Sequence, residues 1–209
     1  MSDDLYRELT PLPDAVAAFT GWIAYLDLEF TRHLNPELRS EIVRDELHQL
    51  YMGHAYAGKL NSTMVTEQGL TVLQFTLDPR NATLEPEYYA DIDVEKYAVI
   101  KPLIWFWQMF DRSPVGLNQW LGFRFRAMLG RHIFRHMGQN VTFFQGVEFT
   151  FGYNLTIADN CILHKNVLLD DRNELLIPEG SSVSDSTRVS SPTYSAGIVP
   201  NGTGQALAD

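Results

Sequence analysis

The chain has 209 residues, of which 45% are hydrophobic and 20% are charged. This composition suits one large globular domain or two small ones with a real core. Sixteen basic and 26 acidic residues give a formal net charge of −10 at pH 7. Such a surface repels the phosphate backbone, so general nucleic-acid binding is not expected.

The first part of the chain is predicted to be mainly helical. Apolar residues within 13–30 fall on one face of a helix, which Asn35-Pro36 ends. A second helix is expected over residues 37–57. Residues 70–77 alternate imperfectly between apolar and polar side chains before Asp78-Pro79, and we therefore predict a short strand there.

Residues 97–136 are expected to be helical again, with a break near Ser113-Pro114. This segment is rich in aromatic residues, and Trp105, Phe106 and Trp107 are consecutive. The simplest interpretation is a buried or docking helix. Because several arginines follow, a peripheral membrane contact through these three residues is the alternative. No segment has the roughly eighteen uncharged apolar residues of a membrane span.

Large apolar residues then recur every six positions in three triplets, and the pattern returns after twenty residues. A small or β-branched residue follows the first two members of each triplet by four positions. This spacing predicts a solenoid of three-sided coils with one corner loop per coil. A small antiparallel sheet is the alternative, but it does not require a common phase of twenty residues. The nine anchors are Met137, Phe143, Phe149, Ile157, Leu163, Leu169, Ile177, Val183 and Val189.

Two segments carry a resemblance to a known family. Ile157-Ala-Asp-Asn-Cys161 and Ile177-Pro-Glu-Gly-Ser181 resemble the hexapeptide repeat of left-handed β-helix acyltransferases. Residues 105–185 are similar to the sugar O-acetyltransferases among them. The resemblance implies transfer of an acyl group from acetyl-CoA or another acyl-CoA to a sugar or glycan-type hydroxyl. It also implies a left-handed coil and a homotrimer.

The pattern and the resemblance together predict an α+β chain in three parts. Residues 1–136 form a mainly helical region with a short strand segment. Residues 137–194 form a left-handed parallel β-helix of about three coils. Residues 195–209 are rich in small and turn-forming residues and are expected to be a flexible, disordered tail.

An acyl transfer to a hydroxyl needs a general base, and His164 is the histidine that falls within the repeat. It follows the anchor Leu163 directly, so we expect it to point outward. Asp170 and Asp171 lie in the corner loop of the same coil and are the candidate orienting groups. An outward histidine on a solenoid is more often a surface or interface residue, which is the alternative interpretation.

The sequence departs from the family at the expected base position. The acetyltransferases that it resembles carry this base in a Ser-His-Thr-His segment, which alignment of the anchors places on Ser191-Pro192-Thr193-Tyr194. Proline has no titratable group, and tyrosine titrates near pH ~10. The competing hypothesis is therefore a shortened, catalytically impaired relative that acts in assembly.

The remaining reactive side chains predict no further chemistry. Cys161 is the single cysteine and stands at an inward position, so we expect it to be structural. His132 and His136 are four residues apart but lack the Glu of a His-Glu-x-x-His motif, so no metal is expected. The first residues lack the basic and apolar regions of a signal peptide. We therefore expect a cytoplasmic protein, with membrane association as the alternative.

Overall fold

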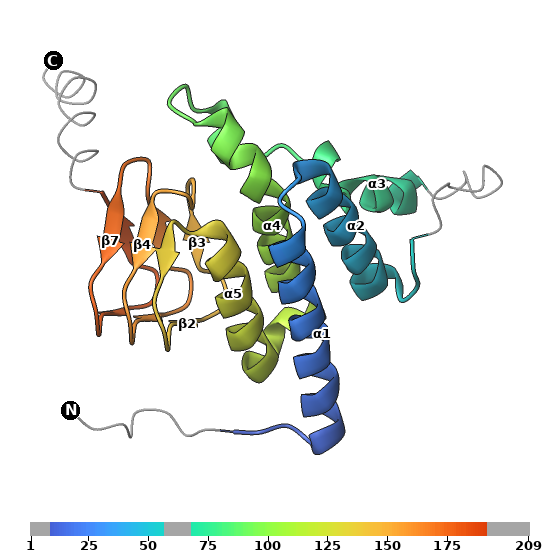
Figure 1. Ribbon diagram of the computed structural model, residues 1–209. Coiled ribbons are helices and arrows are strands. Elements are labelled where there is room, and N and C mark those ends of the chain that lie inside the picture. Colours follow the sequence, from blue (N-terminus) through green and yellow to red (C-terminus); the bar gives the residue numbers. More distant parts are fainter. Residues whose placement is uncertain (1–8, 57–67, 192–209) are drawn as a thin grey trace, which may run out of the picture.

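A helical layer packs against one end of a stack of β-coils in the computed structural model (Figure 1). The structure describes residues 9–56 and 68–191. The helices of this layer are α1 (Pro13–Arg32), α2 (Pro36–Met52), α3 (Gln68–Thr76), α4 (Val94–Arg112) and α5 (Gln119–Ile133). Short 3₁₀ turns connect them: η2 (Pro79–Asn81), η3 (Glu85–Tyr88) and η4 (Pro114–Leu117).

Side-chain caps explain where several helices begin. The Asn35 side chain accepts hydrogen bonds from the backbone amides at the start of α2, and Pro36 occupies the first turn. Asp93 and Asn118 cap α4 and α5 in the same way. A side-chain acceptor at this position satisfies amides that have no partner within the helix. At the other end of α2, Gly53 adopts a positive φ of 71° that suits glycine.

The strand predicted for residues 70–77 is wrong, because this segment forms helix α3. Leu73 packs against the core and Leu77 is fully buried, whereas Val72 and Phe75 are exposed. In a strand, positions 73, 75 and 77 share one face, so Phe75 would be buried with the other two. The buried residues are four apart, which is helical spacing. The side chain of Trp105 fixes the end of this helix by donating to the Thr76 carbonyl at 3.1 Å.

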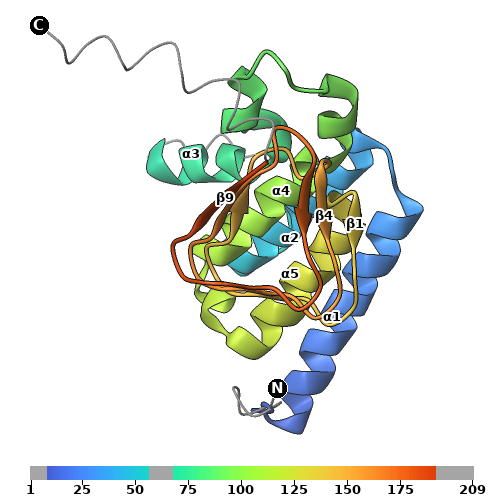
Figure 2. The same ribbon diagram turned by 90° about the vertical axis from the view of Figure 1, so that its left-hand side faces the viewer.

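The C-terminal part is a stack of parallel coils, as the twenty-residue period predicted. Each strand pairs with the strand twenty residues later, for example His136 with Thr156 and Leu155 with Leu175. In the described residues, nine strands form the three sheets β1-β4-β7, β2-β5-β8 and β3-β6-β9. Figure 2 looks along the stack and shows the coils superimposed. The strands are β1 (His136–Met137), β2 (Thr142–Phe143), β3 (Glu148–Phe149), β4 (Leu155–Ile157), β5 (Ile162–Leu163), β6 (Leu168–Asp170), β7 (Leu175–Ile177), β8 (Ser182–Val183) and β9 (Arg188–Ser190).

The interior of the stack is filled by the predicted anchors. Ile157, Leu163 and Leu169 of the middle coil are fully buried. Cys161 is also fully buried, and its Sγ lies 3.1 Å from the Pro178 carbonyl. Burial is the main reason that its pKa is raised, which keeps the sulfur in the unreactive thiol form. The prediction of a structural cysteine agrees with this environment.

Two of the three corners use a residue with positive φ in every described coil, and the third corner does so at Gly152. This region of backbone conformation favours glycine and asparagine. One corner repeats every twenty residues as Asn140, Asn160 and Gly180, and the other as Gly146, Asn166 and Ser186. The third corner holds the residues in excess of the six-residue steps, at positions 150–154 and 170–174. Its length sets the eight-residue step between anchors across this corner and leaves the six-residue steps within the coil unchanged.

Aspartates at the corners tie each coil to the one before it. Each carboxylate accepts a hydrogen bond from the backbone amide twenty residues earlier. The pairs are Asp159 with Gln139 at 2.7 Å, Asp171 with Phe151 at 2.8 Å and Asp185 with Lys165 at 3.0 Å. Charge-assisted bonds of this kind are stronger than bonds between neutral groups. They supplement the ladder bonds of the short strands.

An aromatic cluster joins the helical layer to the first coil. The Trp107 ring is 1% exposed and packs edge-on against Phe143 and Phe149. Its Nε1 donates to the Val147 carbonyl at 3.1 Å. Phe106 is fully buried in the same layer. Phe106 and Trp107 thus lie within the junction, whereas Trp105 is partly buried.

A buried ion pair strengthens this junction. Arg126 of α5 is fully buried and donates to the Asp111 carboxylate of α4 at 2.7 Å and to the Phe143 carbonyl at 3.2 Å. Asp111 in turn accepts from the Gly146 amide of the first coil at 2.9 Å.

Within residues 9–56 and 68–191, no helix combines the length and the apolar character needed to cross a membrane.

Candidate functional site

His164 lies on the outward side of the sheet β2-β5-β8, as predicted. It follows β5 directly and is half-buried. Its ring stacks on Phe144 of the preceding coil, with 5.1 Å between centroids and 15° between planes. Its Nε2 lies 3.1 Å from Oγ of Ser182 in the following coil. Residues from the two neighbouring coils therefore set the orientation of this imidazole.

This environment is compatible with acid–base chemistry. A serine hydroxyl can donate to or accept from an imidazole nitrogen, so Ser182 orients the ring in either protonation state. Phe123 of α5 packs edge-on against Phe144 at 4.9 Å and supports the stack from the helical layer. A histidine held in this way near the surface can accept a proton from a hydroxyl that binds beside it.

Asp171, predicted to orient His164, binds backbone amides of the coil. It is fully buried, and its carboxylate accepts from the amides of Phe151 at 2.8 Å and Asn154 at 3.3 Å. Burial raises its pKa to about 6, although these hydrogen bonds act in the opposite direction. Its geometry matches that of the other two corner aspartates. These contacts give Asp171 a structural role.

Asp170, the other predicted orienting residue, belongs to the outward side of a different sheet, β3-β6-β9. Its carboxylate binds Nε and Nη2 of Arg172, each at 3.0 Å, and Nη2 of Arg188 at 2.6 Å. Burial opposes its ionisation, but the hydrogen bonds from the two arginines outweigh burial and hold its pKa below the ordinary value. Asp170 therefore binds two arginines. The role of His164 as a base stays a prediction.

A polar groove lies over Asp170, with a cavity volume of about 400 Å³. Its floor is the sheet β3-β6-β9, and its walls come from the segment around η3 and from α4. Tyr89, Arg112, Glu148 and Arg188 are among the residues that line it. Sequence reasoning missed this groove. One available signal was that outward positions 148 and 188 are charged and lie two full coils apart.

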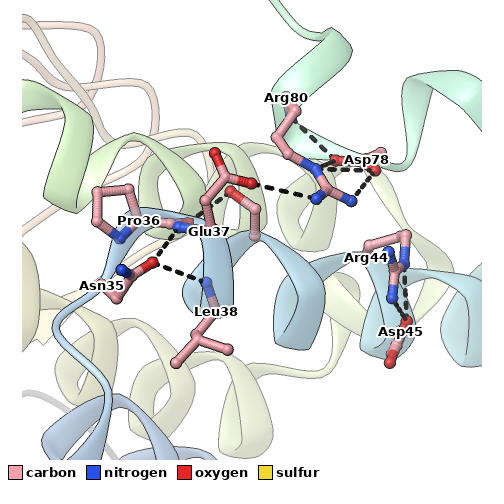
Figure 3. Close-up of polar contacts among 9 residues, drawn as sticks. Asn35, Pro36, Glu37, Leu38, Arg44, Asp45, Asp78 and Arg80 are labelled. Carbon is pink, nitrogen blue, oxygen red and sulfur yellow. Dashed lines mark hydrogen bonds and ion pairs between the residues drawn. The ribbon is translucent and has the colours of Figure 1, made fainter.

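A second cavity of about 340 Å³ lies between the start of α2, η2 and α4. Figure 3 shows the polar contacts at its edge, where Arg80 binds Asp78 at 2.7 Å and Glu37 at 3.2 Å. Lys101 pairs with Glu87 at 2.8 Å on the opposite side. The charged groups of this cavity are therefore paired with one another. Such pairs stabilise the contact between the helices only weakly.

The other sequence-level candidates are not brought together. His132 is bonded to Asp27 of α1 at 2.8 Å, whereas His136 is exposed on β1. No group of three or more His, Cys, Asp or Glu side chains could hold a metal ion in the part of the chain that the structure describes. Pro192 and Tyr194, at the position of the expected base segment, lie outside the described residues.

Comparison of the chain with models of known families, with curated proteins and with solved structures finds no match. The resemblance to hexapeptide-repeat acyltransferases rests on the two hexapeptide segments and on the twenty-residue period. The parallel register of the three sheets is consistent with that period.

Proposed function

We propose that the chain is an O-acyltransferase of the hexapeptide-repeat type, with a left-handed coil and His164 as its general base. The observation that supports this most directly is the outward imidazole of His164, which Phe144 and Ser182 orient from the neighbouring coils. The acyl donor is acetyl-CoA or another acyl-CoA, and the acceptor is a sugar or glycan-type hydroxyl. The proposal includes a cytoplasmic homotrimer, in which neighbouring coil sides form the donor site.

The proposed reaction needs one proton acceptor and no metal. His164 takes the proton of the acceptor hydroxyl as its oxygen attacks the thioester carbonyl. The new C–O bond forms and the C–S bond breaks. The imidazolium then returns the proton to the departing sulfur, so that CoA leaves as a thiol and the histidine is neutral again.

A thiol-release assay with acetyl-CoA and a panel of sugars tests this function. We expect turnover with at least one acceptor and a loss of about 10²- to 10⁴-fold in His164→Ala, the typical contribution of a general base. His136→Ala is the matched control, because His136 is an exposed histidine on another side of the stack. Equal turnover in wild type and His164→Ala would contradict the role of this histidine.

Assembly is the second candidate function, and a specific observation favours it. Asp170 and Asp171 are both engaged in contacts within the coil, so neither is shown to orient a base. The anchors Val183 and Val189 of the last described coil are only partly buried. A folded protein that releases no thiol, binds no acetyl-CoA and forms a discrete oligomer in sizing experiments would favour this function over acyl transfer.

A further inference from the structure

The floor of the groove is built by two outward rows of the sheet β3-β6-β9. The strand register aligns Glu148, Leu168 and Arg188 in one row, and Asp170 belongs to the other. Adjacent strands lie about 4.8 Å apart, so each row brings residues distant in sequence within reach of one small molecule. The cavity of about 400 Å³ falls within the size range of small-molecule sites.

Asp170 holds two guanidinium groups in place at this floor. Arg172 binds both carboxylate oxygens, and its guanidinium lies 5.1 Å from the centre of the Tyr89 ring. Arg188 binds the same carboxylate through one nitrogen, and its side chain is still 58% exposed. Within the described part of the chain, Arg188 donates its side-chain hydrogen bond to Asp170. Since a guanidinium has five N–H donors, Arg188 keeps donors for a ligand.

Arg112 adds a third guanidinium from the α4 wall. Its side chain is 59% exposed, and its contact with Glu148 is loose at 3.9 Å. Planar guanidinium groups bind carboxylate and phosphate oxygens in a two-pronged geometry. Three carboxylates, of Asp170, Glu85 and Glu148, also line the cavity and balance its three arginines. Arg188 and Arg112 are the arginines whose side chains are more than half exposed, so their guanidinium groups can reach a ligand. This arrangement suits an oxyanion.

The remaining lining suits a hydroxylated ring. Tyr89 and Trp105 contribute aromatic surfaces, against which the apolar face of a sugar can pack. Thr150, Gln108 and Glu148 contribute hydroxyl, amide and carboxylate groups that can bind sugar hydroxyls. Aromatic, neutral polar and cationic groups thus meet in one cavity.

We propose that this groove binds a sugar that carries a carboxylate or a phosphate group, with Arg188 and Arg112 as the ligands of the oxyanion. The groove lies on a different sheet from His164. Binding there needs no acyl donor, so this site is additional to the proposed acyl transfer and can be tested without it. Failure of one proposal is therefore distinguishable from failure of the other.

Calorimetric titration of the full chain tests the site with four probes: glucuronate, glucose 6-phosphate, glucose and inorganic phosphate. We expect at least one of the two acidic sugars to bind about tenfold or more tightly than glucose. Arg188→Gln is expected to weaken that binding by about tenfold or more, since a hydrogen bond to a charged group is lost. Which of the two acidic sugars binds shows whether the site takes a carboxylate or a phosphate group.

Arg135→Gln is the matched control, because Arg135 is 55% exposed and pairs with Glu174 away from the groove. We expect it to bind the acidic sugar as the wild type does. The proposal is overturned if neither acidic sugar binds to the folded protein, if glucose binds equally well, or if Arg188→Gln binds unchanged. Inorganic phosphate that binds as tightly as glucose 6-phosphate would overturn the sugar assignment.

Discussion

The two ends of the coil stack differ in what covers them. At the first coil, α4 and α5 supply Trp107 and a buried Arg126, and Phe143 beneath them is fully buried. At the last described coil, Val183 and Val189 are only partly buried. The repeat supplies the same type of anchor at both ends. From this difference in burial we expect an anchor to contribute fully to stability only where a neighbouring layer covers it.

The first end also contains polar groups that the last end lacks. Asp111, Arg126 and the Gly146 amide form a buried network that links two helices to a corner of the first coil. The last described coil is joined to the middle one by ladder bonds and by side-chain contacts of three exposed residues, Ser182, Asp185 and Arg188. We therefore expect substitutions at the first end to affect folding of the whole chain, and those at the last end to act locally.

The largest expected effect comes from breaking the network at the first end. Asp111→Ala leaves the fully buried Arg126 without its carboxylate, and we expect the free energy of unfolding to fall by about 3–5 kcal/mol. Urea denaturation followed by circular dichroism measures this change. Asp185→Ala, which removes an exposed corner aspartate of the last coil, is the control with an expected loss of about 1 kcal/mol. Equal losses would contradict the asymmetry of the stack.

A pH-dependent effect is expected from Asp171, which ties the middle coil to the first. Burial raises its pKa from 3.8 to about 6. Between these values the folded state binds more protons than the unfolded state, so stability from this residue falls as the pH rises. The total change is about 3 kcal/mol and is complete above about pH 6.

Asp171→Asn removes this titration. We expect the variant to show a flatter dependence of unfolding free energy on pH between about pH 4 and pH 6 than the wild type. Denaturation curves at several pH values within this window measure the difference. Parallel pH profiles for the two proteins would show that Asp171 is not the group responsible. The opposite sign holds for Asp170, whose arginine partners lower its pKa.

A matched pair of valines compares the two ends directly. Val147 of the first coil is buried, whereas Val183 of the last is partly exposed. We expect Val147→Ala to lower the free energy of unfolding by about 2 kcal/mol, because two methyl groups leave a cavity in a covered core. Val183→Ala is expected to lower it by about 1 kcal/mol or less. Thermal unfolding midpoints rank the variants, and the reverse order would rule out this account of the ends.

The smallest expected effect lies in the helical layer. Asn35→Ala removes the cap of α2 that Figure 3 shows, and we expect a loss of about 1 kcal/mol. Asn35→Asp retains a side-chain acceptor and serves as the control. A loss that exceeds that of Val147→Ala in the same denaturation series would mean that the helical layer depends on this cap more than on its packing against the coil.

The coil could be predicted from the sequence because the same inward packing repeats in every coil. Ile157, Leu163 and Leu169 occupy equivalent inward positions, so one period describes all of them. The segment of α3 has no such repetition. Its apolar residues fit either a strand or a helix over a short window. The decision depends on which of them reach the core, namely Leu73 and Leu77, and the sequence alone does not contain that information.

The candidate sites show the same distinction. The outward position of His164 follows from its place after an anchor. The partners of Asp170 and Asp171 do not follow from their positions in the sequence, because a corner carboxylate can bind an amide, an arginine or a histidine equally well. The charged outward positions 148 and 188 hinted at the floor of the groove. Its walls could not be predicted, because residues near position 89 and in α4 form them, far in sequence from the strands of the floor.

The corners with positive φ have a consequence for how this chain can change in length. An inserted residue within a side would turn every later anchor outward. The third corner is different, because it already holds residues beyond the repeating step and Asn173 within it is exposed. That corner also carries Arg172 and borders the groove. We therefore expect insertions and deletions to be tolerated at this corner, beside the proposed sugar-binding groove, while the rest of the coil keeps its length.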